Sequence, residues 1–164
     1  MMRKRGKKFN PERARIMRAA AADMFARAID RASDLGEEDA TRLETAHLAA
    51  LASLSDGVGT TNDYNALVEC ITIARVISEK MKDEETAEAC FVAANDGMHA
   101  LNSVRARYMQ DKSLSLTNPE HDALSYAIDL YAQLMRVCKR GEIIDALHEA
   151  RAEIKAATSA QAPR

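Results

Sequence analysis

Three carboxylate–histidine pairs in this sequence have a spacing that could serve to bind metal ions. In each pair the carboxylate lies three residues before the histidine, so that both lie on one helix face: Glu44–His47, Asp96–His99 and Asp145–His148. Pairs of Glu-x-x-His motifs hold two metal ions in ferritin-like bundles, but such a site needs further glutamates from two other helices. Glu69 is a candidate for one of them, although Asp replaces Glu in two of the three pairs.

The position of His47 favours a structural role over a metal site. His47 lies on an apolar stripe, where a histidine is more often a core residue satisfied by one hydrogen bond. We therefore expect no cofactor, and a ferritin-like metal-binding bundle is kept as a minor alternative.

Other catalytic motifs do not fit the sequence. The segment Gly57-Val58-Gly59-Thr60-Thr61 lacks the lysine of a phosphate-binding loop and follows a helix, so it is read as a turn. No nucleophile motif or zinc-binding spacing is present, and Cys70 and Cys90 lie on apolar faces where a thiol stays protonated. We expect a protein that is not an enzyme.

The charge of the chain is divided unevenly. Residues 1–18 contain eight Lys or Arg and one Glu, a net charge of +7, whereas the remaining 146 residues carry −9. A basic segment of this kind can neutralise phosphates with a steep salt dependence. The candidate nucleic-acid-binding residues are Arg3, Lys4, Arg5, Lys7, Lys8, Arg13 and Arg15. A solvated terminus without a ligand is the alternative.

The acidic remainder predicts a different kind of partner. A surface of this charge repels DNA and can dock on a basic protein. Inhibitors of nucleic-acid enzymes bind in this way, because their acidic surfaces mimic the charge of the nucleic acid. The partner would be a host or phage protein, and close packing of Ala-rich helices also allows a homodimer.

Composition predicts an all-α fold. The chain has 31 Ala, 6 Gly, 3 Pro and no Trp, so that helix formers dominate and the turn residues of a β-sandwich are too few. No apolar run is long enough to span a bilayer, and no hydrophobic segment follows the basic start as in a secretory signal. We expect a soluble cytoplasmic bundle of five or six antiparallel helices, with a basic flexible tail at 1–9, a helical domain at 10–157 and a frayed end at 158–164.

Apolar periodicity and capping residues place the helices. The first begins at Asn10-Pro11 and runs to about Asp34, the second begins at Glu37, and the third follows Thr60, ends near Lys82 and should be the most buried. The fourth carries Ala87 to Tyr108 with Phe91 and Met98 on its apolar stripe, the fifth opens at Asn118 and ends at Lys139-Arg140-Gly141, and the sixth has an apolar stripe from Ile143 to Ile154. Met98 and Met109 are expected to fill the core.

Three local patterns allow more than one interpretation. The segments starting at Asn65 and Asp122 align with an offset of 57 residues, which indicates either a duplicated hairpin or common amphipathic patterning. Gly97 indicates a kink or a close helix crossing. Part of the same segment partially matches a helix-turn-helix, with Arg105 and Arg107 available for contacts, and fits an ordinary core stripe equally well.

The middle of the chain resembles a known group of proteins. The segments are His47–Leu51, Gly59–Leu67 and Ile71–Glu79. They are similar to short, uncharacterised helical proteins encoded on bacterial phages, prophages and plasmids, which also tend to begin with a basic peptide. The resemblance covers about half of the chain and implies an accessory protein of a mobile element, without catalytic residues.

Overall fold

The computed structural model describes residues 30–160, and the secondary-structure elements in that range are all helices. The helices are α2 (Glu37–Ser55), α3 (Thr61–Glu79), α4 (Glu84–Asp111), α5 (Asn118–Val137) and α6 (Arg140–Ala160). The all-α class predicted from composition is confirmed. The expected tail at 1–9 and most of the first helix lie outside the described residues, whereas α6 continues three residues past the expected boundary at 157.

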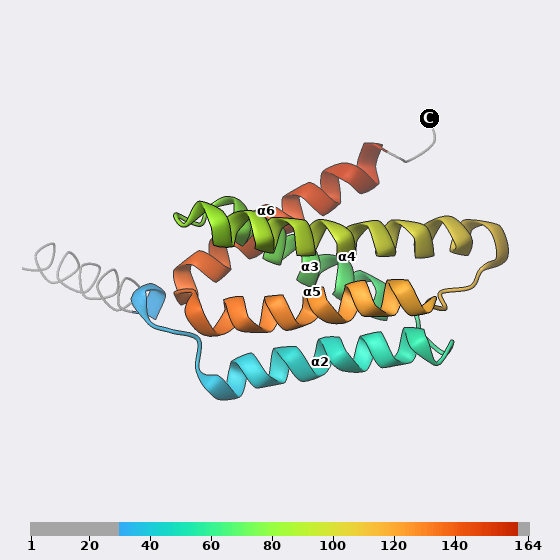
Figure 1. Cartoon of the computed structure of the whole chain (residues 1–164), viewed down its shortest axis with the longest axis horizontal. Helices are drawn as coiled ribbons and strands as arrows, with labels where there is room; N and C mark the ends of the chain where they lie inside the picture. The colour runs from blue at the N-terminus through green and yellow to red at the C-terminus, as the bar shows by residue number, and fades with distance from the viewer. Residues whose placement is uncertain (1–29, 161–164) are drawn as a thin grey trace, which may run out of the picture.

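Four helices form an antiparallel ring, and α6 packs outside it. Each of α2 and α4 contacts both α3 and α5, while α3 and α5 also contact each other across the ring (Figure 1). Successive helices run in opposite directions, because short connections join them. α6 packs on α3 and crosses behind the ring, so that its C-terminal half leaves the bundle.

Two capping boxes fix where α3 and α5 begin. The backbone N–H of Thr60 donates to Oδ2 of Asp63 at 2.8 Å, and that of Thr117 donates to Oε2 of Glu120 at 2.8 Å. The two boxes are 57 residues apart, as are the fully buried pairs Leu67–Leu124 and Ile71–Ile128. The predicted helix starts are confirmed within one residue, and the duplication remains a prediction.

α3 is the central helix, as its wide apolar stripe predicts. Nine of its residues are buried, including Ile71 at 0% exposure. Gly97 of α4 lies against this helix, because a Cβ on Gly97 would be 2.8 Å from Cβ of Ala127 and 3.0 Å from Cδ1 of Ile71. Gly97 therefore marks a close crossing of α4 with α3 and α5.

Several local predictions are wrong. Lys139-Arg140-Gly141 does not end α5: the helix ends at Val137, and Gly141 lies inside α6, where a Cβ would be 3.0 Å from the carbonyl oxygen of Arg31. α3 ends at Glu79 and not near Lys82. Two residues assigned to the core, Phe91 and Met109, are 36% and 66% exposed.

The helix-turn-helix interpretation is also wrong, because its whole segment is part of one continuous helix. α4 runs unbroken from Glu84 to Asp111. It contains no turn that would set a recognition helix apart from a supporting one.

Gly97→Ala tests the close crossing. Alanine gains about 1 kcal/mol of helix propensity, but overpacking against Ala127 and Ile71 costs about 1–3 kcal/mol, so we expect a net loss in the free energy of unfolding. Urea denaturation measures it. In a double-mutant cycle, Ala127→Gly should recover most of the packing loss; additive effects would show that the two positions are not in contact.

Candidate functional site

The predicted nucleic-acid-binding residues cannot be placed. Arg3, Lys4, Arg5, Lys7, Lys8, Arg13 and Arg15 all lie outside the described residues. Their role therefore remains a prediction from charge alone.

In two of the three carboxylate–histidine pairs, the carboxylate is bound by an arginine. Glu44 accepts from Nη2 of Arg136 at 2.7 Å, and Asp145 accepts from Nη2 of Arg31 at 2.7 Å. Glu69, the candidate additional ligand, accepts from Nη2 of Arg151 at 2.9 Å. Among residues 30–160, no three His, Cys, Asp or Glu side chains come together in a metal-binding arrangement.

His47 is packed as a core histidine but lacks the hydrogen bond that would satisfy it. Its ring meets that of Tyr131 edge to face, with 5.0 Å between centroids, and Nδ1 is buried without a hydrogen bond of normal geometry. Burial lowers the pKa of His47, while the carboxylate of Glu69 and the backbone of Leu43 oppose this shift. The neutral ring is therefore favoured in the folded protein.

Arg107 has a structural role and is not an outward nucleic-acid contact. Its guanidinium donates to both oxygens of Glu120 at 2.6 Å and to the carbonyl of Ser115 at 2.8 Å. This bidentate pair lowers the pKa of Glu120 to about 2, with a further contribution from the Thr117 backbone N–H. Arg107 thus fastens the α4–α5 loop to the start of α5.

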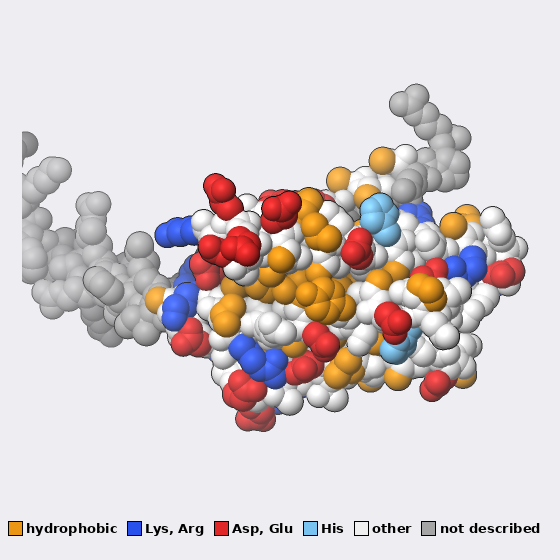
Figure 2. All heavy atoms as spheres, viewed as in Figure 1, with side chains coloured by type: hydrophobic (Ala, Val, Ile, Leu, Met, Phe, Trp, Pro, Cys, Tyr) orange, Lys and Arg blue, Asp and Glu red, His pale blue; other side chains and the backbone are white. Residues whose placement is uncertain are grey.

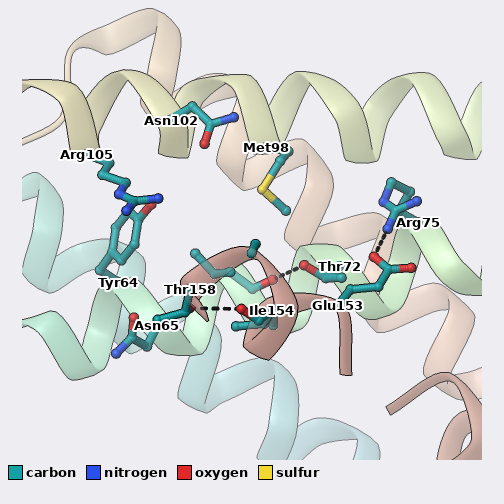
Figure 3. Close-up of a pocket in the computed structure, with 12 residues that line it drawn as sticks. Tyr64, Asn65, Thr72, Arg75, Met98, Asn102, Arg105, Glu153, Ile154 and Thr158 are labelled. Atoms are coloured by element: carbon teal, nitrogen blue, oxygen red, sulfur yellow. Dashed lines mark hydrogen bonds and ion pairs between the residues drawn. The ribbon is translucent and has the colours of Figure 1, made fainter. Parts of the chain in front are cut away.

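A groove of about 490 Å³ lies between α3, α4 and α6 (Figure 3). We call it the α3–α4–α6 groove. Its lining residues are Tyr64, Asn65, Val68, Thr72, Arg75, Met98, Asn102, Arg105, Glu153, Ile154, Ala157 and Thr158. It forms because α6 packs on α3 with one face while its C-terminal half diverges from the bundle.

The groove has an apolar part and a polar rim. Half-buried Val68, Met98 and Ile154 supply apolar surface, while Arg105 and Asn102 project from α4 on the rim. Tyr64 donates its hydroxyl to the carbonyl of Leu101 at 3.3 Å, which fixes its ring beside Arg105. A surface of this type suits a ligand with an apolar body and an acidic group.

The groove continues toward the C-terminal end of α4. A second hollow of about 260 Å³ shares Tyr64, Asn65 and Arg105 with it and is extended by Tyr108 and Met109. The two hollows therefore line α3 from Thr61 to Arg75, a distance of about 20 Å at the helical rise of 1.5 Å per residue.

A second surface combines acidic and apolar residues at the α3–α4 corner. Glu79, Asp83, Glu84, Glu85 and Glu88 are exposed there, and Figure 2 shows acidic side chains over the N-terminal half of α4. Glu79, Glu84 and Glu88 line a hollow of about 360 Å³ whose apolar lining includes Met81, Ala87 and Phe91. We call this surface the acidic corner.

Sequence reasoning missed the groove and predicted only the charge of the acidic corner. Met98 and Ile154 occupy apolar stripes and were assigned to the core, and nothing in the local pattern shows that α6 leaves one side of them open. Phe91 gave the only usable signal, because it sits among carboxylates three residues after Glu88.

Replacing His47 tests its unsatisfied burial. His47→Leu removes a buried nitrogen without a partner, so we expect about 1 kcal/mol of added stability at pH 7.5. Because the folded-state pKa is lowered, wild type loses stability as pH falls below 6.5, and the gain should be larger at pH 5.5. Urea unfolding at both pH values measures it, with the exposed His99→Gln as control. An equal gain at both values would contradict the pH argument.

Replacing Arg107 tests the tie to Glu120. Arg107→Met should cost about 1–3 kcal/mol at pH 7, since it removes a charge-assisted, part-buried hydrogen-bonded pair. The pKa of Glu120 is depressed, so its contribution is present above pH 4.5 and is lost as pH falls toward 2. The difference in the free energy of unfolding between variant and wild type should become smaller over that pH interval, as urea unfolding at a series of acidic pH values would measure. A constant difference would assign the loss to packing instead.

Comparison with known proteins adds no relative to these observations. No protein-family model, curated protein or solved structure matches the chain. No helix of residues 30–160 has the length and apolar character needed to cross a membrane. The function is therefore inferred from the chain's own residues and surfaces.

Proposed function

We propose that this chain is a non-catalytic interaction protein that binds another protein in the α3–α4–α6 groove. The occupant is an apolar segment, helical or extended, that carries a carboxylate beside its apolar side chains. The observation that carries the proposal is the groove itself, with Val68, Met98 and Ile154 inside and Arg105 on its rim.

The dimensions of the groove support a peptide as its occupant. Together with the adjoining hollow it follows α3 for about 20 Å, which matches roughly four turns of an amphipathic helix. Recognition of this kind places apolar anchors at helical spacing in the groove and charged groups at the rim. Arg105 supplies the cation that such a charged group would meet.

Engagement of the acidic side chains supports a role without catalysis. Glu44, Glu69 and Asp145 are bound by arginines, and the pKa of the Cys70 thiol is raised by burial. These groups act in the packing of the bundle. The resemblance to mobile-element proteins favours a host or phage protein as the partner, in a bacterial cytoplasm.

Nucleic-acid binding through the N-terminal segment is the second candidate. It is favoured by the +7 charge of residues 1–18, whereas residues 30–160 carry 23 carboxylate and 13 Lys or Arg side chains, a net charge of −10. Any contact with phosphates would therefore come from the segment and not from the bundle.

Variants that fill the groove test the proposal. Ala157 lines the groove and its exposed neighbour Ala156 does not, so Ala157→Tyr should block a partner that Ala156→Tyr leaves in place. Arg105→Glu should weaken the same partner at least tenfold, about 1.4 kcal/mol, with the exposed Lys155→Glu as its matched control. Affinity purification from nuclease-treated bacterial lysate with quantitative mass spectrometry measures retention.

The outcomes separate the two candidates. A protein lost with Ala157→Tyr and Arg105→Glu but retained with both controls supports the groove. Retention of every captured protein by the groove variants contradicts it. Nucleic acid that is released by salt and lost when residues 3–8 are neutralised would support the second candidate instead.

A further inference from the structure

The acidic corner of the bundle has no partner in the described part of the chain. No Lys or Arg among residues 30–160 lies within 4 Å of the carboxylates of Glu84, Glu85 or Glu88. Of the other charges at this corner, Glu79 pairs with Arg75, Lys80 pairs with Glu149 and Asp83 accepts from the backbone N–H of Thr86, while Lys82 is exposed and forms no ion pair with these carboxylates. The hollow at this corner is lined by Glu84 and Glu88, by exposed Phe91 and by Met81.

The complementary charge is found in the chain itself. Residues 1–29 contain nine Lys or Arg and two carboxylates, a net charge of +7, against −10 for residues 30–160. Five of the nine cations lie between Arg3 and Lys8 and are followed directly by Phe9, the first aromatic residue of the chain. This order, cations and then an aromatic ring, matches carboxylates around an apolar hollow.

The described chain begins beside the acidic corner. Arg31 donates to Asp145 at 2.7 Å, and Asp30 pairs with Arg140 at 3.3 Å, so that residues 30 and 31 lie against the start of α6. Lys80, the residue that follows α3, contacts α6 through Glu149 and favours the ionised form of Asp145. The first described residues and the α3–α4 corner therefore meet on the same stretch of α6, at one end of the bundle (Figure 1).

We propose that residues 3–9 of the same chain dock on the acidic corner, with Lys and Arg side chains against Glu84, Glu85 and Glu88 and the Phe9 ring in the hollow beside Phe91. Chain length does not limit this contact, because residues 10–29 lie between Phe9 and Asp30 and each residue spans up to about 3.3 Å. The contact is a charge-driven intramolecular one. Because both groups belong to one chain, the local concentration of these cations at the corner is high. The carboxylates of the corner therefore compete with any external polyanion for the Lys and Arg side chains.

Zero-length carbodiimide cross-linking of the full chain, read by mass spectrometry, tests the contact. It joins Lys amines to carboxylates only when they touch, so at about 20 mM salt we expect Lys4, Lys7 and Lys8 to be joined chiefly to residues 84–88. The yield should fall roughly tenfold at about 0.5 M salt, where charges separated by several ångströms are screened.

Matched variants make the test specific. Glu84→Gln/Glu85→Gln/Glu88→Gln should abolish these cross-links, whereas Asp111→Asn/Asp122→Asn/Asp129→Asn, an equal charge change at exposed sites elsewhere, should leave their yield unchanged. Phe9→Ser keeps every charge and should lower the yield several-fold, since it removes the apolar part of the contact.

Three results would overturn the inference. Cross-links distributed evenly over exposed carboxylates would show a segment without a preferred site. An unchanged cross-link yield in Phe9→Ser would show that the Phe9 ring does not occupy the hollow. Mixing ¹⁴N- and ¹⁵N-labelled chains gives only same-isotope cross-links for an intramolecular contact; mixed-isotope products would assign the segment to a second copy.

Discussion

Burial of α3 on nearly all sides is the constraint on which the bundle depends. A helix surrounded by α2, α4, α5 and α6 can be packed only if its neighbours approach closely, and close approach requires small side chains at the crossings. Gly97 meets this requirement from α4, and Ala74, Ala94 and Ala127 are each 0% exposed. The alanine-rich, tryptophan-free composition is therefore the composition that this arrangement needs, with core volume supplied by Leu, Ile and Met.

The groove follows from the same constraint. α6 completes the cover of α3 over its first turns, where Ala146 and Ala150 are buried, and beyond them it diverges from the ring. Val68 and Met98 consequently remain only half-buried, because no further helix of the described chain encloses them. Arg75 pairs with Glu153 and ties α6 to α3 at the edge of this opening. The opening is thus a fixed feature of how one helix packs, with cations on its border.

Local sequence predicted what local forces decide and failed where tertiary contacts decide. The starts of α3 and α5 were predictable because Thr60 and Thr117 are capped by carboxylates three residues later. The role of Gly141 was predicted wrongly, because in the sequence a glycine that ends a helix looks the same as a glycine that makes room for a distant segment of backbone. The segment in question contains Arg31, which lies more than a hundred residues earlier in the chain. Arg107 was misread likewise, since its partner Glu120 comes from the next helix. The groove depends on α6 and had no local signal.

The two candidate surfaces occupy successive stretches of α3, and this arrangement determines how they can act together. The acidic corner follows the C-terminus of α3, whereas the adjoining hollow of the groove includes Thr61 at its N-terminus. A segment on the corner would therefore not obstruct a peptide in the groove. The two binding events would communicate through charge, because Arg75 of the groove forms an ion pair with Glu79 of the acidic corner, one helical turn away and within the roughly 8 Å Debye length of physiological salt. The geometry accordingly favours two sites that do not overlap and that are coupled through this ion pair.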